Sequence, residues 1–356
     1  MIKELFIEEL NGNKRSFKFK FNDDLNLFTG LNGCGKTTIL KILWFVNSAN
    51  FSSLFQEINF KVLKLTTDKY YIEISKNPKK ISWRKIEDRK LREIQKTYPF
   101  EIEDLFPEEI SGITKKEFEK YCDSSIFFPT FRRIEGGFSI DGISQFRRFS
   151  YSLKEGLSEL SKELSTKKHQ FIASVSTDDI TSLINKEYTS IMKDIDDLQR
   201  KQFKKLMELT KVKNELTPEE KLKQIESEIK MVEEKREERF KAFEVLQNLI
   251  SNVFHKKGID MDSIKFGDEH NLISSDKLSA GEKQMLSFLC YNTFSKNKII
   301  FIDEPELSLH PDWQRLLIPK LLKQGNNNQF FIATHSPFIY TKYADKEIIL
   351  SEDKGE

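Results

Sequence analysis

The sequence has few of the residues that cross-link a chain and no segment that would anchor it in a membrane. Its 356 residues include three cysteines, at positions 34, 122 and 290, and no CxxC pair. This excludes a disulfide framework and a cysteine-rich zinc site, and it predicts a reducing, cytoplasmic location. No apolar run approaches the ~20 residues that cross a bilayer. The start, MIKELFIEEL, has charges where a secretion signal needs an apolar core. We therefore expect a cytosolic chain without a membrane partner.

An excess of charge of one sign is also lacking. The chain has 58 basic and 56 acidic residues, a net charge of +2, so its overall charge does not indicate a nucleic-acid partner. Residues 76–92 are a local exception, with eight basic and two acidic residues around Trp83. This segment is either a contact for a phosphate backbone or a solvated surface hairpin.

Glycine and proline are nearly absent from one long segment. Residues 153–254 contain one of each, Gly156 and Pro218, and apolar residues recur there at helical spacing. Thr217-Pro218 followed by two glutamates is a helix start. We predict two antiparallel helices that meet near residue 217, either as a short coiled coil or as part of a helical bundle. The balance of 14 basic and 13 acidic residues in 193–241 favours a solvated arm that docks a protein.

The segments on either side have the mixture of strand and helix patterns that is typical of an α/β fold. Strands are predicted at 2–10, 16–22, 25–29, 60–75, 126–131, 299–302 and 329–333, and a helix at 37–46. The predicted domains are an N-terminal lobe at 1–152, a helical insertion at 153–254 and a C-terminal lobe at 255–356. The predicted fold class is α/β, with a mixed sheet and an inserted helical hairpin.

Residues 30–37, GLNGCGKT, match the phosphate-binding loop pattern GxxxxGK[ST] between a predicted strand and a predicted helix. The glycines let backbone N–H groups surround phosphate, and the helix directs its positive dipole end at the same anion. We predict that Lys36 bridges the β- and γ-phosphates of ATP and that Thr37 binds magnesium. The nucleotide-binding set in the loop is Asn32, Gly33, Gly35, Lys36, Thr37 and Thr38.

A second motif is the apolar strand that ends in Asp303 and Glu304. A buried strand can deliver its terminal carboxylate to a metal ion, so Asp303 is predicted to hold magnesium. Glu304 is then placed to orient the attacking water and to accept its proton. The pattern alone is weak, and it gains force from its pairing with the phosphate loop.

Residues 278–284, LSAGEKQ, open a predicted helix about 20 residues before that strand. The serine hydroxyl and the N–H groups at this helix N-terminus form a second candidate anion site, which assigns Ser279, Gly281 and Glu282 to nucleotide. The alternative is an ordinary capping box between Ser279 and Glu282.

These motifs, in this order, resemble ATPases of the ABC/SMC class. LSAGEKQ resembles the LSGGQ signature, which in that class caps the γ-phosphate held by another subunit. Residues 304–314, EPELSLHPDWQ, resemble the EPExxLHPxxQ form of RecF-like, OLD-like and related bacterial AAA-type ATPases. The resemblance covers about 1–150 and 255–356. It implies an ABC-type P-loop head with ATP and Mg²⁺ as cofactors.

The resemblance also implies individual roles. His335, in the sequence ATHS after a predicted strand, matches the switch histidine that contacts the γ-phosphate. The glutamine of the Q-loop is not clearly placed, and Gln56 and Gln145 are weak candidates. Arg132 or Arg133 either reaches phosphate or is a structural surface pair.

The resemblance implies an ATPase switch that forms a homodimer or a higher even-numbered oligomer around nucleotide. Its catalytic residues are Lys36, Glu304 and His335. The small size and short arm resemble the ATPase components of Septu-type, PARIS-type or retron-associated anti-phage systems, in which a separate nuclease or toxin is the effector. A RecF-type repair ATPase that binds DNA or RNA directly is the alternative. A transporter subunit is a distant third, because its motif would resemble DEPTSALD.

Overall fold

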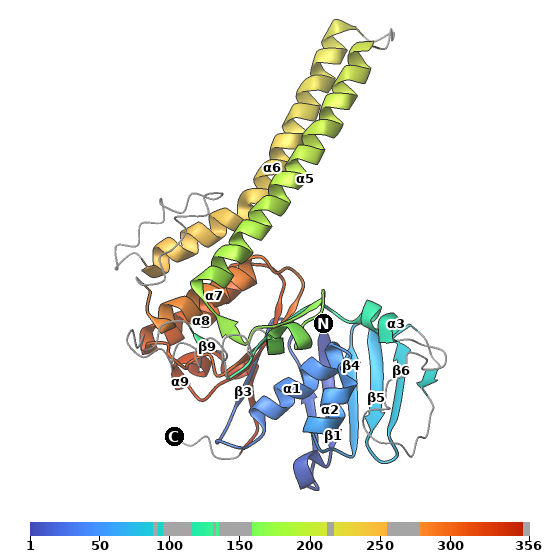
Figure 1. The fold of residues 1–356 in the computed structure, drawn as a ribbon, viewed down its shortest axis with the longest axis vertical. Helices are drawn as coiled ribbons and strands as arrows, with labels where there is room; N and C mark the ends of the chain where they lie inside the picture. The colour runs from blue at the N-terminus through green and yellow to red at the C-terminus, as the bar shows by residue number, and fades with distance from the viewer. Residues whose placement is uncertain are drawn as a thin grey trace, which may run out of the picture. The chain divides into compact units, whose positions relative to one another are not determined.

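The computed structural model describes residues 1–87, 92–94, 115–130, 133–134, 159–211, 217–254 and 278–351. The chain divides into two compact units. The first contains residues 1–134, 138–174 and 295–356, and the second contains residues 135–137 and 175–294. The class is α/β, as predicted, and each unit is described separately below (Figure 1).

An antiparallel sheet forms one layer of the first unit. Its order is β2-β1-β4-β5-β6-β7, with β1 at Ile2–Glu8, β2 at Ser16–Lys20, β4 at Val62–Thr67, β5 at Tyr70–Ser75, β6 at Lys80–Lys85 and β7 at Arg92–Ile94. Residues alternate between a buried and a more exposed face, and Leu5 and Leu65 are fully buried as cross-strand partners. The hairpin predicted at 2–22 is confirmed, with its turn around Asn11.

A parallel sheet forms the second layer of this unit. Its order is β10-β8-β12-β13-β3-β14, with β3 at Leu25–Thr29, β8 at Ser125–Phe128, β10 at His169–Phe171, β12 at Ile299–Asp303, β13 at Gln329–Ala333 and β14 at Glu347–Ile349. Every neighbouring pair in it is parallel. Strands β3, β8, β12 and β13 are buried along their whole length, which explains their unbroken apolar runs.

Helix α1 (Lys36–Asn47) lies between the two sheets of the first unit. Its buried residues share one core with residues of both sheets, such as Leu5 of β1 and Phe331 of β13. The ring centroid of Trp44 lies 5.5 Å from that of Phe127 and 6.1 Å from that of Phe301. Burying such aromatic side chains fixes the helix firmly against β8 and β12. The N-terminus of α1 is thereby held beside the parallel sheet.

Shorter helices complete the first unit: α2 at Phe51–Glu57, α3 at Lys115–Tyr121, α8 at Pro311–Lys323, α9 at Pro337–Tyr340 and 3₁₀ turns at Leu10–Gly12 and Thr341–Lys346. Helix α8 begins with His310, whose imidazole Nδ1 accepts a hydrogen bond from the backbone N–H of Asp312, followed by a proline in the first turn. Strands β9 (Arg133–Ile134) and β11 (Ser174–Val175) form a separate two-stranded sheet.

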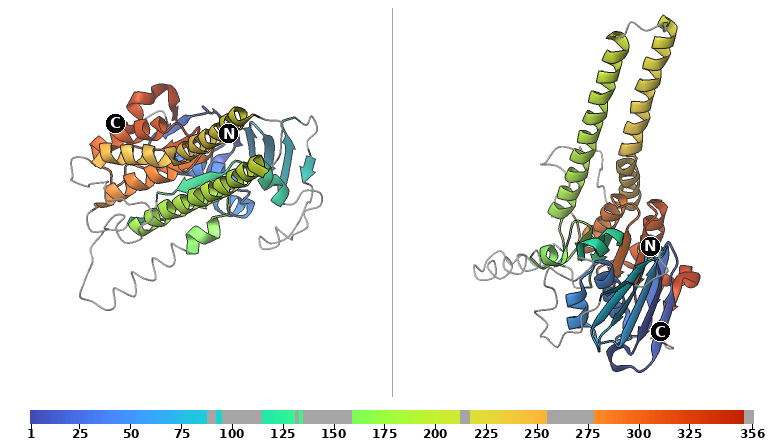
Figure 2. Two further views of the ribbon diagram at one scale, coloured as in Figure 1. Left: turned by 90° about the horizontal axis from the view of Figure 1, so that it is seen from above. Right: turned by 90° about the vertical axis from the view of Figure 1, so that its right-hand side faces the viewer.

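The second unit contains α5 (Thr177–Lys211), α6 (Pro218–Phe254) and α7 (Ala280–Thr293). Helices α5 and α6 run side by side as the predicted antiparallel pair (Figures 1 and 2). Gln202 donates its side-chain N–H to the carbonyl oxygen of Glu228 at 3.0 Å across the pair. Glu228 lies on the contact line between the two helices, and its neighbour Ile229 is 43% exposed.

Helix α7 packs against both α5 and α6. Near the end of this unit, the ring centroid of Phe243 on α6 lies 5.0 Å from that of Phe294, which follows α7. The helix with the LSAGEKQ segment therefore groups with the helical pair. Among the described residues, no helix is long and apolar enough to cross a membrane.

Candidate nucleotide-binding site

In the first unit, the residues predicted to bind and hydrolyse nucleotide lie where neighbouring strands of the parallel sheet end. Strands β12, β13 and β3 lie next to one another in the same direction. Asp303 ends β12, His335 follows β13, and the phosphate loop follows β3. The carboxyl ends of parallel strands are where α/β proteins bind ligands. The structure thus brings together residues that lie up to 300 positions apart in the sequence.

The phosphate loop depends on two glycines with left-handed backbones. Gly35, at φ +101°, is the residue at which the chain turns into α1. Gly30 has φ +132°, and a Cβ there would lie 2.6 Å from the Oγ atom of Ser351. Ser351 also accepts a hydrogen bond from the N–H of Leu31 at 2.9 Å. Both positions have backbone angles that favour glycine, and at Gly30 the close neighbour also leaves no room for a side chain.

Lys36 is buried at the start of α1, at 5% exposure. Its Nζ donates to the carbonyl oxygens of Gly30 and Leu31 at 2.9 and 3.0 Å. The same nitrogen lies 3.4 Å from Nδ1 of His335. The ammonium is therefore already directed into the loop, close to the predicted switch histidine.

Asp303 is the centre of an oxygen-rich group and is 1% exposed. Thr37 donates its hydroxyl to Oδ1 at 3.1 Å, and Thr130, just after β8, donates to Oδ2. Hydroxyl and carboxylate oxygens are the ligands that Mg²⁺ takes, together with phosphate oxygens and water. The residues present therefore fit magnesium. Thr130 was missed in the sequence, where the only available signal was its place after an apolar strand.

Glu304 and His335 lie on adjacent strand ends. The Oε1 atom of Glu304 is 3.9 Å from Nε2 of His335. Glu304 has a left-handed backbone, φ +47°, and its N–H donates to the carbonyl oxygen of Ala333 at 2.9 Å. A non-glycine residue in this conformation is strained and is typical of functional sites. Burial, and then the neighbouring carboxylates of Asp303 and Glu306, raise the pKa of Glu304, which suits a proton acceptor.

Glu306 is a second residue that sequence reasoning missed. Its Oε1 accepts from the backbone N–H of His335 at 2.6 Å, and its Oε2 accepts from the hydroxyl of Thr334 at 2.9 Å. It belongs to the EPExxLHP segment, whose sequence indicates a branch of the ATPase class but no role for this glutamate. The carboxylate thus holds the segment that carries His335.

Ser279, Gly281 and Glu282 lie at the start of α7 in the second unit. The structure has the capping box: Ser279 N–H donates to Glu282 Oε2 at 2.7 Å, and Glu282 N–H donates to Ser279 Oγ at 3.4 Å. Ser279 is exposed, whereas Gly281 and Glu282 are buried. The capping box already uses the N–H groups of Ser279 and Glu282, so an anion would meet the remaining N–H groups of this helix N-terminus. The assignment of these residues to nucleotide stays a prediction.

The remaining candidates are only partly described. Arg132 and Gln145 lie outside the described residues, and Arg133 is described only as part of β9. Gln56 is exposed on α2. Asn32 and Gly33 are exposed in the loop, and Thr38 is half-buried in the first turn of α1.

The basic segment lies partly on β6. The guanidinium of Arg84 lies 5.4 Å from the ring centroid of Tyr71, and the ammonium of Lys85 lies 4.9 Å from that of Tyr121. Lys76 donates to the carbonyl oxygen of Ile58 at 2.8 Å. These three cations have partners within the protein, whereas Arg89 and Lys90 of the same segment lie outside the described residues.

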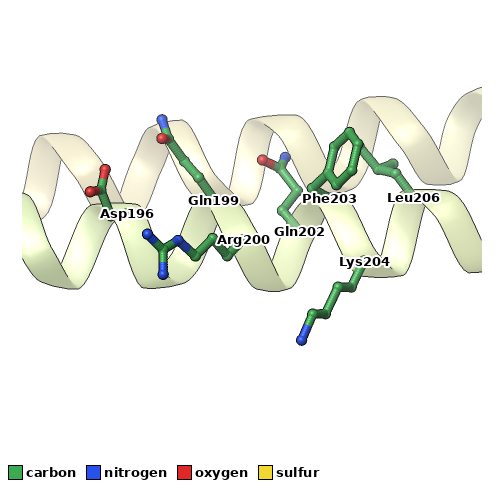
Figure 3. A pocket seen from close by; sticks show the side chains of 7 residues that line it. All are labelled: Asp196, Gln199, Arg200, Gln202, Phe203, Lys204 and Leu206. Atoms are coloured by element: carbon green, nitrogen blue, oxygen red, sulfur yellow. The ribbon is translucent and has the colours of Figure 1, made fainter.

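The helical pair exposes several apolar side chains. Phe203 is 60% exposed and Leu222 is 58% exposed. Phe203 lies beside a pocket on α5 that Figure 3 shows from close by, lined by Asp196, Gln199, Arg200, Gln202, Phe203, Lys204 and Leu206. That the helical pair docks a protein stays a prediction.

Comparison with known proteins places these features in a family. Residues 25–340 match the family model described as "AAA domain, putative AbiEii toxin, Type IV TA system". The chain is 34% identical over 103 residues to the retron Vc95 probable ATPase of Vibrio cholerae serotype O1 biovar El Tor, which is 25% of this chain and 20% of the relative. It is 41% identical over 63 residues to endonuclease GajA of Bacillus cereus (strain VD045), 16% of this chain and 11% of the relative. The matches thus span a fifth or less of these relatives.

Among solved structures, the chain is similar to a head domain of Smc from Pyrococcus furiosus with an extended coiled coil, bound to the C-terminal domain of ScpA. The TM-score is 0.42 and the identity 13%, over 96% of this chain and 91% of that one.

Proposed function

The chain belongs to this AAA-domain family, and from that premise we propose that it hydrolyses Mg-ATP as a dimer that controls a separate effector in anti-phage defence. The observation that carries the proposal is the convergence of Lys36, Asp303 and His335 at adjacent strand ends. A lysine, a carboxylate and a strained glutamate beside a glycine loop are the parts that phosphoryl transfer needs.

The roles of the residues follow from their contacts. Lys36, now on the loop carbonyls, turns to the β- and γ-phosphates. Thr37 and Asp303 would hold magnesium, with Thr130 as an additional oxygen donor. Bound there, magnesium would supply positive charge against the charge that develops on the phosphates. Glu304 accepts a proton from the attacking water, and His335 donates a hydrogen bond to the γ-phosphate, giving ADP and inorganic phosphate.

The proposed dimer rests on the LSAGEKQ segment, which resembles the LSGGQ signature. We place Ser279 and the N–H groups at the start of α7 on the γ-phosphate bound by the partner copy. Two such composite sites favour closure when the γ-phosphate is present and lose that preference after hydrolysis. The helical pair then transmits closure to an effector, and the exposed Phe203 surface supports a contact there.

The experiment is the isosteric Glu304→Gln variant. It removes the proton acceptor and leaves the phosphate loop intact. We expect it to bind ATP, to hydrolyse ATP at least 100-fold more slowly than wild type, and to elute as a dimer in ATP by light scattering. Lys36→Ala is the control that stays monomeric. A Glu304→Gln variant that hydrolyses ATP at the wild-type rate would refute the assignment.

The defence role is tested separately. Co-purification of the natively expressed chain with a nuclease or toxin supports it. Stimulation of hydrolysis by DNA, with no co-purifying protein, supports the repair alternative instead.

A further inference from the structure

The EPExxLHPxxQ segment makes a set of hydrogen bonds to residues 334–336 that the hydrolytic roles above leave unexplained. Glu306 lies in the turn after β12, and Gln314 lies on the first turns of α8. Both side chains reach the short stretch between β13 and α9. That stretch carries His335, so the two loops on either side of the active site are joined by side chains.

The contacts of Glu306 are made with both carboxylate oxygens. One oxygen accepts from His335 N–H at 2.6 Å, and the other accepts from the Thr334 hydroxyl at 2.9 Å. Thr334 is fully buried, and its hydroxyl also accepts from the N–H of Ser336 at 3.0 Å. Hydrogen bonds to a charged carboxylate are stronger than those between neutral groups, so Glu306 makes the strongest side-chain contact with residues 334–336.

Gln314 makes the second side-chain contact with this segment. Its Oε1 accepts from the hydroxyl of Ser336 at 2.5 Å, and its Nε2 donates to the carbonyl oxygen of Leu309 at 2.8 Å and to that of Glu306 at 3.4 Å. The amide therefore connects the histidine segment to the turn that begins at Glu304. Residues on both sides of His335 are held from the same turn.

This arrangement has a consequence for the imidazole. His335 lies 3.4 Å from Lys36 and 3.9 Å from Glu304, and its side chain is 29% exposed. A half-exposed ring keeps such a position only if its backbone is fixed. A misplacement of about 1 Å in a catalytic group can lower a rate by 100-fold.

We propose that Glu306, assisted by Gln314, is a positioning residue that fixes the switch histidine relative to the catalytic glutamate. This rests on the proposed ATPase function. Glu306 acts through the position of His335. The chemistry needed at position 306 is an acceptor for the backbone N–H of His335.

The test is a double-mutant cycle with His335→Ala. We expect Glu306→Ala to lower kcat by about 10- to 100-fold, with the affinity for a fluorescent ATP analogue unchanged. In the His335→Ala background, the same change should alter kcat by less than about twofold, because residues that act as one unit are not additive. Effects that multiply would overturn the proposal.

Two further variants separate positioning from other roles. Glu306→Gln keeps a carbonyl acceptor for His335 N–H and should have a rate between those of Glu306→Ala and wild type. A Gln variant as slow as the Ala variant would contradict the proposal, because it would assign the charge a direct role. Asp312→Ala is the matched control, since it removes a carboxylate from α8 that does not contact residues 334–336 and should leave kcat unchanged.

Folding and function are distinguished by separate readouts. Circular dichroism and melting report whether each variant folds. If Glu306→Ala does not fold, Gln314→Ala and Glu306→Gln replace it in the double-mutant cycle with His335→Ala. Failure of the proposed function appears as a wild-type chain without ATP hydrolysis, whereas failure of the positioning role appears as additivity in an active protein.

Discussion

Thr130 donates its hydroxyl to Oδ2 of Asp303, although 173 residues separate the two in the chain. The contact arises because β8 pairs with β12 in the parallel sheet, so that the residue after one strand meets the end of the other. Thr37 approaches the opposite oxygen of the same carboxylate. A metal ion held by Asp303 would therefore have a threonine on each side.

We predict that Thr130→Val weakens the response to magnesium. Valine matches the shape of threonine but leaves one oxygen of a buried carboxylate without its donor. The magnesium concentration that gives half-maximal hydrolysis should rise by about 10-fold, a typical cost of disturbing residues around a metal site. Thr130→Ser should retain the wild-type response. Binding of a fluorescent nucleotide in EDTA should not change, and a Thr130→Val variant with wild-type magnesium dependence would rule out the role.

Much of this site can be predicted from local pattern. The GLNGCGKT loop is specified by its glycines, and the φ values at positions 30, 33 and 35 are positive. The helical pair is specified by the scarcity of glycine and by Thr217-Pro218, and α6 does begin at Pro218. These features depend on residues that are close in sequence, so one stretch contains the whole signal.

The contacts that sequence reasoning missed are those between distant strands. Thr130 and Glu306 gain their partners only when β8, β12 and β13 align. The grouping of α7 with α5 and α6 is equally a matter of packing. Helical spacing alone also does not show which apolar side chains of the pair are exposed, such as Leu222, or that Gln202 makes a polar contact with Glu228 between the helices.

The phosphate loop gives a second prediction, for Gly30→Ala. The new Cβ would lie 2.6 Å from Ser351 Oγ and 3.1 Å from Ser351 N, at a backbone angle that alanine rarely adopts. We expect nucleotide affinity to fall by at least about tenfold, a loss of ~1.4 kcal/mol. Gly12→Ala is the control: it also has a positive φ, +82°, but open space around it. It should cost about 1–2 kcal/mol of stability without changing affinity, as titration with a fluorescent nucleotide would show.

Asp123 gives a prediction on acid stability. Burial on its own would raise its pKa, but hydrogen bonds from Lys69 and from the amino terminus outweigh burial and lower the pKa below its ordinary value of 3.8. A lowered pKa in the folded state means that the carboxylate stabilises the protein above the pKa of the unfolded chain. This contribution is lost as the pH falls through the lower, folded value.

Asp123→Asn should therefore lower the free energy of unfolding at pH 7 by about 1–2 kcal/mol, and the loss should be smaller at pH 3, below the ordinary pKa of 3.8. Urea unfolding at the two pH values, followed by tryptophan fluorescence, measures the difference. Asp68→Asn is the control, because Asp68 is 43% exposed and should contribute little at either pH. An equal loss in the Asp123 variant at both pH values would contradict the linkage.

The final prediction concerns Ser279 and the proposed composite site. Replacing it with alanine would also remove a helix cap, so Ser279→Asp is the sharper change: aspartate caps helices as well as serine does. Its negative charge would lie where the proposal puts the partner's γ-phosphate. We expect the Ser279→Asp, Glu304→Gln variant to bind ATP and melt like Glu304→Gln, yet to remain monomeric in ATP by light scattering.

Mixing two inactive variants is a second test of whether Lys36 and Ser279 at one nucleotide come from different copies. A Lys36→Ala copy and a Ser279→Asp copy each lack one half of a site, but a mixed dimer contains one site with both halves intact. Because the intact Lys36 and the intact Ser279 come from different copies, mixing should restore part of the wild-type hydrolysis rate only if the site is shared between chains. Activity that stays at the level of the separate variants, in a mixture shown to contain mixed dimers, would mean that each copy hydrolyses ATP alone.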